Sequence, residues 1–124
     1  MHRESKIIRS YKDLDVWKKG IEIVELVYKA TSKFPTDERF GLVSQMQRAA
    51  VSIPSNIAEG YARQHTKEYQ QFCYIALGSC SELETLLIIV KRRNYISDDI
   101  ISMLEEYLDH ESRMLTNLIK GLKA

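Results

Sequence analysis

Residues that end helices or cross-link a chain are scarce in this sequence. Its 124 residues include only five glycines, two prolines and two cysteines. Because glycine and proline mark most turns, their scarcity favours a few long elements. Cys73 and Cys80 lie seven residues apart, which is about 10 Å along a helix and too far for a disulfide. We therefore expect two reduced, buried thiols.

No segment has the pattern of a secretory signal or a membrane span. The first eleven residues contain Arg3, Lys6 and Arg9 but no apolar stretch. The longest apolar run, residues 86–90, has only five residues, whereas a spanning helix needs about 20. The sequence therefore predicts a cytoplasmic protein with no membrane partner.

The chain also lacks a strong net charge. Its formal charge is +1, so no overall basic field would attract nucleic acid. Residues 1–35 nevertheless carry eight Lys/Arg against five Asp/Glu, and residues 97–124 carry three against six. Pairing between a first and a fourth helix would explain this asymmetry. With 44% hydrophobic and 28% charged residues, the composition is that of one folded globular domain.

Apolar residues recur at alternating spacings of three and four in four segments. This repeat keeps one face of a helix against its neighbours and is typical of helical bundles. In order, the repeats comprise Leu14, Trp17, Ile21, Val24 and Tyr28; Phe40, Val43, Gln47, Ala50, Pro54, Ile57 and Tyr61; Tyr69, Phe72, Ala76, Ser79, Leu83, Leu86 and Val90; and Ile101, Leu104, Leu108, Glu111, Leu115, Leu118 and Leu122. These positions predict a common core that contains Trp17, Ile21, Phe72, Leu83, Leu104 and Leu115.

Residues that end and start helices separate the four repeats. Phe34-Pro35 ends the first helix, because the residue before proline avoids α-helical backbone angles. Thr66 and Ser97 offer N-caps for the third and fourth helices. Short connections between long helices make neighbouring helices antiparallel. The prediction is an all-α, up-down-up-down four-helix bundle over residues 11–124, preceded by a flexible basic tail over residues 1–10.

Pro54 lies inside the predicted second helix. Proline has no backbone N–H to donate, so we expect a bend at this position. The bend either curves the helix around the core or shapes an interface.

The segment 45–60, QMQRAAVSIPSNIAEG, resembles the signature of the bacterial 23S rRNA intervening-sequence proteins. Further landmarks are DLDVWK at 13–18, FP at 34–35, FGL at 40–42, and ALGS at 76–79 followed by EL at 82–83. The resemblance implies a homopentameric ring of four-helix bundles with no known enzymatic activity. More distant relatives are accessory subunits of diversity-generating retroelements, in which the ring engages a reverse transcriptase and nucleic acid.

The width of the apolar arcs also favours self-association. Apolar residues cover about half of the first predicted helix, where Val16, Ile23 and Val27 lie beside the heptad positions. On the second helix the additional apolar residues are Leu42, Met46, Ala49 and Ile53. A bundle helix needs an apolar stripe of only about 100°. The surplus indicates a second buried surface, in which we expect Ile23 and Met46, or else a wide monomer core.

Six polar residues are candidates for an interface or a polar network: Arg48, Ser52, Asn56, Glu59, Glu82 and Glu111. Arg48 would pair with a carboxylate such as Glu59 or Glu82 across a helix or subunit boundary, unless this stripe is a solvated face. Glu111 lies in the middle of the fourth apolar arc, where a carboxylate must find a partner or raise its pKa. We expect either a hydrogen bond to a buried Tyr, Ser or Arg, or a functional polar centre.

No catalytic, cofactor or metal constellation is present. Di-iron bundles use two Glu-x-x-His motifs, whereas this chain has three histidines and no such motif. No glycine-rich phosphate loop or nucleophile with a local base occurs. We therefore predict a protein that is not an enzyme and has no cofactor.

Two functions remain from the sequence. The first is a homo-oligomeric scaffold or binding module, with itself and a further protein as partners. The second is a nucleic-acid-binding accessory factor that contacts phosphates through its basic residues. The candidate contacts are Lys18, Lys19, Lys91, Arg92 and Arg93, with the tail in support. The alternative for these cations is that they are ordinary solvated helix ends.

Overall fold

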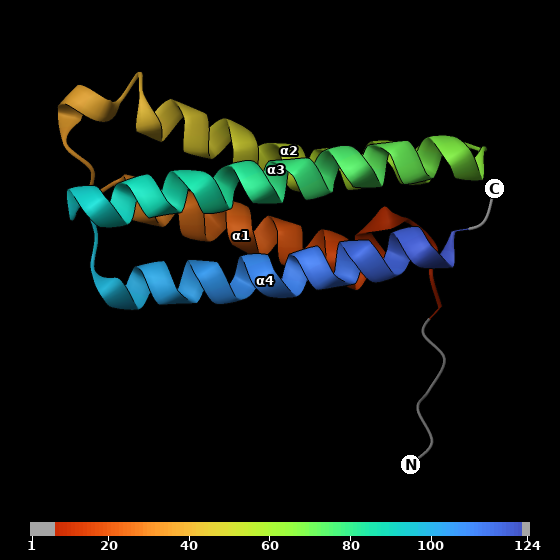
Figure 1. Cartoon of the computed structure of the whole chain (residues 1–124). Helices are drawn as coiled ribbons and strands as arrows, with labels where there is room; N and C mark the ends of the chain where they lie inside the picture. The colour runs from red at the N-terminus through yellow and green to blue at the C-terminus, as the bar shows by residue number, and fades with distance from the viewer. Residues whose placement is uncertain (1–6, 123–124) are drawn as a thin grey trace, which may run out of the picture.

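A computed structural model describes residues 7–122 and contains, over that range, four α-helices, two short 3-10 turns and no strand (Figure 1). The elements are η1 (Tyr11–Asp13), α1 (Asp15–Thr31), η2 (Thr36–Glu38), α2 (Leu42–Ala62), α3 (Thr66–Arg93) and α4 (Asp98–Gly121). Figure 1 shows each helix running against the direction of the one before it. The predicted four-helix fold is confirmed. Residues 1–6 of the predicted tail lie outside the described range.

Local sequence explains several helix ends. The Ser97 hydroxyl caps α4 by accepting a hydrogen bond from the backbone N–H of Ile100 at 3.4 Å. Asn94 ends α3 in the left-handed conformation with φ 57°, which asparagine tolerates better than most residues. Ser10 and Asp13 form a capping box around η1. Pro54 lies inside α2, which is helical from Leu42 to Ala62.

The four helices enclose one core. Each helix packs against its neighbours in sequence, and α1 closes the bundle against α4. The largest fully buried apolar side chains are Ile23, Val27, Met46, Ile53, Ile57, Leu83, Leu87, Ile101, Leu104, Leu108 and Leu115. At Gly60, α2 comes so close to α3 that an added Cβ would lie 2.7 Å from the Cβ of Phe72.

The loops at one end of the bundle are tied together. The Tyr95 hydroxyl, between α3 and α4, donates a hydrogen bond to Oε2 of Glu38 at 2.8 Å. The Tyr95 ring also packs on Phe34 at a centroid distance of 5.3 Å. At the other end, Nε2 of Gln70 donates to the carbonyl oxygens of Ile119 and Leu122 and so fastens the end of α4 to α3.

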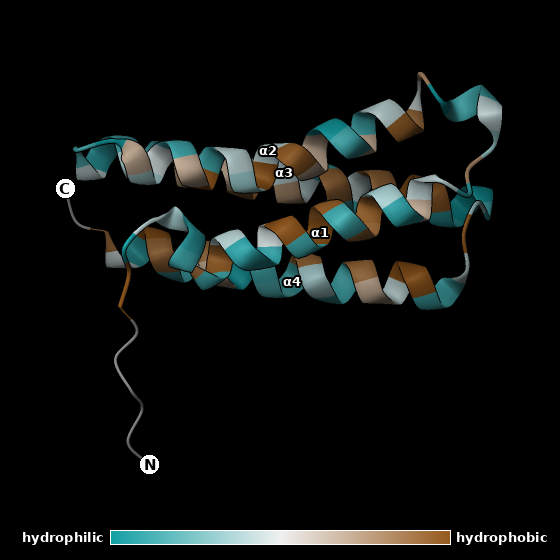
Figure 2. Ribbon diagram, turned by 180° about the vertical axis from the view of Figure 1, so that it is seen from behind, coloured by the Kyte–Doolittle hydropathy of each residue, from teal (hydrophilic) through white to brown (hydrophobic). Residues whose placement is uncertain are grey.

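The inward face of α1 is not the predicted one. Its buried residues are Val16, Gly20, Ile23, Val27, Ala30 and Thr31. Ile21, which was expected in the core, is 37% exposed, and Trp17 is only partly buried. Figure 2 shows hydrophobic residues recurring along α1 among hydrophilic ones. Both stripes have helical spacing, but the inner one contains Gly20 and Ala30, whose small size lets neighbouring helices approach.

Two further expectations about burial are wrong. Ile23 and Met46, expected in an interface between copies, are fully buried inside the protomer. Phe40, expected on the seam of the second helix, precedes α2 and is 89% exposed. Phe72 is partly buried beside Gly60, whereas Leu83, Leu104 and Leu115 are fully buried as predicted.

By length and composition alone, α3 would suffice to cross a membrane. Polar residues nevertheless interrupt the short apolar runs of this helix. Buried residues recur along α3 from Cys73 to Val90, and the helix packs against α2 and α4. A core helix of a bundle can have the same length and composition, so these two properties are only weak evidence for a membrane span.

Candidate association surface

An apolar groove lies between α1 and α2 on the outside of the bundle. It is lined by Tyr11, Trp17, Ile21, Val24, Val51, Pro54, Ser55 and Ala58. Tyr11, from the 3-10 turn, packs edge-on against Trp17 with ring centroids 5.3 Å apart. Ile21 and Val51 are exposed on opposite sides of the groove, and Tyr28 is exposed further along α1.

The groove contains the heptad stripe that the sequence predicted as the inner seam of the first helix. Trp17, Ile21 and Val24 repeat at spacings of four and three and line the groove; Trp17 and Val24 also pack against the edge of the core, whereas Ile21 is exposed. The repeat is thus a second apolar stripe, in addition to the one that the core uses. A regular stripe of this kind is what a helix needs in order to pack against a further helix.

A second group of exposed apolar residues lies on the outer face of α3. Tyr74, Ile75, Ile88 and Ile89 are all exposed there. Between the two pairs, Gly78, Ser81 and Thr85 are exposed and small. Large contiguous apolar surfaces are uncommon on proteins that work alone, whereas isolated exposed residues are ordinary. The α3 face and the α1/α2 groove together hold most of the exposed large hydrophobic side chains of residues 7–122.

Glu111 is completely buried inside the bundle. It has 0% exposure, and neither carboxyl oxygen has a hydrogen-bond partner among the described residues. Gly20 of α1 faces it, since a Cβ on Gly20 would lie 3.2 Å from Oε2 of Glu111 and 3.3 Å from Cβ of Pro54. Three helices therefore meet around this carboxyl group.

Burial sets the ionisation of Glu111. Removal from water raises the pKa of this carboxyl to about 8, and the charge of Glu22 adds to the rise while Lys19 opposes it. Glu111 is therefore mostly protonated at neutral pH. The hydrogen bond to a Tyr, Ser or Arg that the sequence predicted is absent from the described residues.

Ser52 and Asn56 belong to a polar contact within the chain. The Ser79 hydroxyl of α3 donates to the Ser52 hydroxyl of α2 at 2.8 Å. Nδ2 of Asn56 donates to the same Ser52 oxygen at 2.8 Å and to its carbonyl oxygen at 2.7 Å. This cluster joins α2 to α3 through small side chains. Much of the 45–60 signature thus serves helix packing, because Met46, Ala49, Ala50, Ile53, Pro54, Ile57 and Gly60 are buried.

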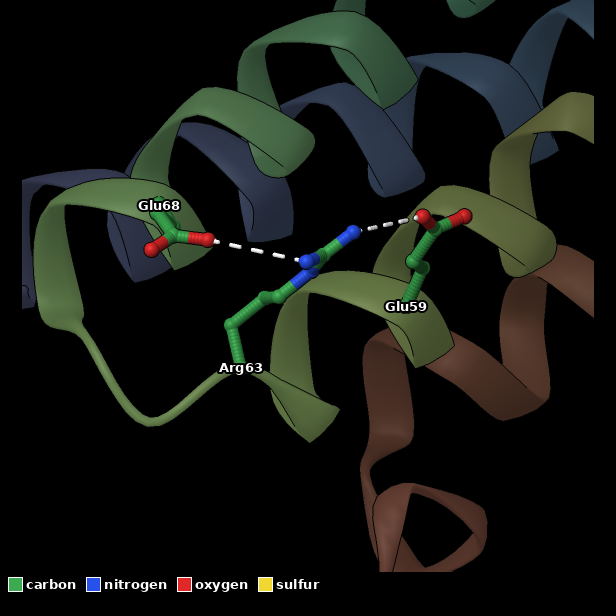
Figure 3. Close-up of polar contacts among 3 residues, drawn as sticks. All are labelled: Glu59, Arg63 and Glu68. Atoms are coloured by element: carbon green, nitrogen blue, oxygen red, sulfur yellow. Dashed lines mark hydrogen bonds and ion pairs between the residues drawn. The ribbon is translucent and has the colours of Figure 1, made fainter.

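Glu59 pairs with Arg63 rather than with Arg48. Arg63 lies 3.0 Å from Glu59 and 3.8 Å from Glu68, across the turn between α2 and α3 (Figure 3). A pairing of Arg48 with Glu59 or Glu82 within the chain is absent: within residues 7–122, neither Arg48 nor Glu82 has an ion-pair partner, and both are exposed. A pairing across a subunit boundary stays a prediction.

The five candidate phosphate contacts do not form one patch. Lys18 and Lys19 lie in the first turn of α1, whereas Lys91, Arg92 and Arg93 lie in the last turn of α3, at the opposite end of the bundle (Figure 1). Lys19 is also engaged elsewhere, because its Nζ lies 4.2 Å from the centroid of the Tyr107 ring.

Two cations that the sequence did not single out lie near the α3 group. Lys33 adjoins Phe34 and Arg39 adjoins Glu38, and both Phe34 and Glu38 contact Tyr95. Only the folding of the two loops against each other brings these basic residues to the same end, so no local spacing in the sequence could reveal it.

Nothing in the described range suggests metal or thiol chemistry. No three His, Cys, Asp or Glu residues between 7 and 122 are grouped as metal ligands would be. Burial raises the pKa of the Cys73 thiol to about 11 and that of Cys80 to about 12, so neither is a thiolate at neutral pH. Both cysteines are buried and free.

These features define a helical-bundle protein with a packed interior and additional apolar surfaces on its outside. Residues 12–117 match the family model described as 23S rRNA-intervening sequence protein. The chain belongs to this family.

A solved structure with the same fold is that of a protein of unknown function from the S23 ribosomal protein family of Bacteroides thetaiotaomicron VPI-5482. It superimposes with a TM-score of 0.76 at 24% identity, over 85% of this chain and 98% of that one. Neither the family description nor this neighbour's description states an enzymatic activity. No curated protein matches the sequence.

Proposed function

We propose that this protein is a non-enzymatic, homo-oligomeric scaffold that works in the cytoplasm as a pentameric ring of four-helix bundles. The observation that carries the proposal is the heptad stripe of α1, which lies at the edge of the protomer core and lines an apolar groove with α2. The number five comes from the family resemblance of the 45–60 signature.

The free-energy cost of leaving apolar side chains exposed to water supports association through this groove. Each large apolar side chain moved out of water contributes about 1.5–3 kcal/mol at full burial. Trp17, Ile21 and Val51 line the groove, and Ile21 and Val51 are exposed in the isolated chain. Covering them with a second copy would stabilise the assembly without disturbing the core, which is already closed.

Light scattering on a sizing column tests the proposal. The wild-type chain of 14.4 kDa should elute with about five times that mass at micromolar concentration. Ile21→Glu should reduce the mass to that of one chain while leaving the helical circular dichroism spectrum unchanged, because Ile21 is outside the core. A wild-type protein that is monomeric at tens of micromolar would refute the proposal.

Met103→Glu is the matched control. Met103 is 46% exposed on α4, similar to Ile21 at 37%, but does not line the groove. The Met103→Glu substitution should therefore leave the oligomer intact. If both substitutions dissociate the protein equally, the α1/α2 groove is not the specific contact.

A second function, binding of nucleic-acid phosphates, rests on the basic end of the bundle. Lys91, Arg92 and Arg93 end α3, and the adjoining loop adds Lys33 and Arg39. A ring would repeat this group in every subunit and so multiply phosphate contacts.

A mobility-shift titration with structured RNA, single-stranded DNA and duplex DNA tests this second function. Binding should weaken steeply between about 50 and 200 mM salt as counterions are released. The double substitution Arg92→Glu and Arg93→Glu should abolish the shift, whereas Lys18→Glu, at the opposite end, should not. No shift at micromolar protein in low salt would leave the scaffold function alone.

A further inference from the structure

A cyclic assembly of more than two copies needs two different contact surfaces on each chain. Identical patches can pair only across a two-fold axis, which yields a dimer, whereas rings arise from head-to-tail contacts. If the proposed ring exists, the α1/α2 groove must therefore receive a surface from another part of the neighbouring copy. This inference rests on the proposed function and names the partner surface.

The outer face of α3 is the apolar surface that remains. Tyr74 and Ile75 lie near its start, and Ile88 and Ile89 lie near its end. Ile75 and Ile89 lie fourteen positions apart, which is about 21 Å along the helix. On α1, Trp17 of the groove and Tyr28, which is exposed beyond it, lie eleven positions apart, or about 16 Å. The two surfaces are thus of comparable length.

The two surfaces differ in side-chain size: small residues lie in the middle of the α3 face and large ones on the groove side. In the middle of the α3 face, Gly78, Ser81 and Thr85 leave a low surface, and a Cβ on Gly78 would meet no atom within 4 Å. The groove side carries the exposed Ile21 and Val51, and the bulky Tyr28 is exposed further along α1. Large side chains on one surface can then enter the low part of the other, as helix packing requires.

Charge also relates the two surfaces. Arg48 is exposed on α2 one turn before Val51 of the groove. Glu82 is exposed on α3 midway between Ile75 and Ile89, seven residues from each. Neither has an ion-pair partner in the described part of its own chain. An exposed cation beside one apolar surface and an exposed anion on the other favour pairing between copies.

We propose that the outer face of α3 of one copy docks into the α1/α2 groove of the next, with Arg48 and Glu82 paired across the contact. The occupant of the groove is therefore a second copy of this chain, held head to tail.

Two blocked variants test this contact by complementation. The groove variant carries Ile21→Glu and Val51→Glu; the α3 variant carries Ile75→Glu and Ile89→Glu. Each alone should be monomeric and helical, because all four residues are exposed. A one-to-one mixture should form a species of two chains, because one intact groove and one intact α3 face remain.

Charge reversal provides a second measurement on the full-length protein. Arg48→Glu alone and Glu82→Arg alone should each raise the concentration at which the oligomer dissociates, about tenfold. The two reversals in one chain should restore the wild-type value, because the pair is re-formed with opposite polarity.

The outcomes separate this inference from the proposed function. A monomeric wild type overturns both. An oligomeric wild type whose mass the α3 substitutions leave unchanged overturns the inference alone. If both variants are monomeric but do not combine, the contact is not head to tail, and the inference is again wrong.

Discussion

Glu111 shows how one residue can be buried without a partner. Its carboxyl group lies close to Gly20, which Ile53 and Pro54 also approach, and its raised pKa keeps it neutral at pH 7. Neutral carboxyl groups are far less costly to bury than ionised ones. From the other helices, Lys19 and Glu22 of α1 and Cys80 of α3 interact with it electrostatically.

The stability of the bundle should depend on pH through Glu111. Its pKa rises from 4.5 to about 8 on folding, so the folded state binds more protons between these values and stability falls as pH increases through that range. The loss is on the order of 5 kcal/mol, at about 1.4 kcal/mol per pKa unit. Urea unfolding from pH 4 to 9 should show this slope in the wild type but not in Glu111→Gln.

The comparison of the two proteins isolates Glu111 from other titrating groups. The glutamine variant should be similar to the wild type near pH 5 and more stable than it at pH 9. Parallel pH profiles for both proteins would show that Glu111 does not titrate as described.

At Gly60, α2 and α3 come close together. A Cβ there would lie 2.7 Å from Cβ of Phe72 and 3.0 Å from Cδ1 of Tyr69. Gly60→Ala should therefore destabilise the protein by about 1–3 kcal/mol, the usual effect of overpacking. Gly78→Ala, which meets open space, should stabilise it by about 0.5–1 kcal/mol through helix propensity. Thermal unfolding measures both effects. Each variant is made in the Ile21→Glu background, so that association does not contribute. Equal effects of the two substitutions would contradict the prediction.

At the scale of the element, α1 carries two apolar stripes with different uses. The inner stripe, with Ile23 and Val27, belongs to the core, and the outer one, with Trp17 and Ile21, lines the groove. Helix α4 differs, because its single regular stripe from Ile101 to Leu115 is buried as a whole.

Two substitutions two residues apart should distinguish the stripes. Ile23→Glu places a charge in the core and should destabilise the fold by about 4 kcal/mol or more, whereas Ile21→Glu should leave it folded. Circular dichroism melts give the first effect and light scattering the second. A folded Ile23→Glu protein that had lost its oligomer would instead place Ile23 in the interface.

At the scale of the whole molecule, contacts between loops far apart in sequence hold the ends of the bundle together. Tyr95 bonds to Glu38 and packs on Phe34, and Gln70 holds the last residues of α4. The helices are thus linked at both ends as well as along their lengths.

Tyr95→Phe should loosen one end only. It removes the 2.8 Å hydrogen bond to Glu38 but keeps the ring against Phe34. The expected loss of stability is small, because the bond is partly exposed to water even though its acceptor is charged. Amide hydrogen exchange should rise in residues 36–41 and stay unchanged around Gln70. A uniform rise across the chain would show that the contact supports the fold globally.

The pattern of residues along the chain was sufficient to predict four helices, their order and most of their ends. Heptad spacing, Phe34-Pro35 and Ser97 act locally, within a turn or two of the backbone, so they can be read without knowing the fold. The same local pattern identified the buried seams of α3 and α4, where one stripe is clearly the most apolar.

The inward side of α1 depended on the packing of the other helices. Helix α1 has two apolar stripes of similar spacing. The one that contains Gly20 faces inward, because Gly20 leaves room for Pro54 and Glu111. For the same reason the separation of Lys18 from Arg92, and the gathering of Arg39 near Arg93, could not be predicted. These are distances across the bundle, and they are set by which helices become neighbours, not by spacing along the chain.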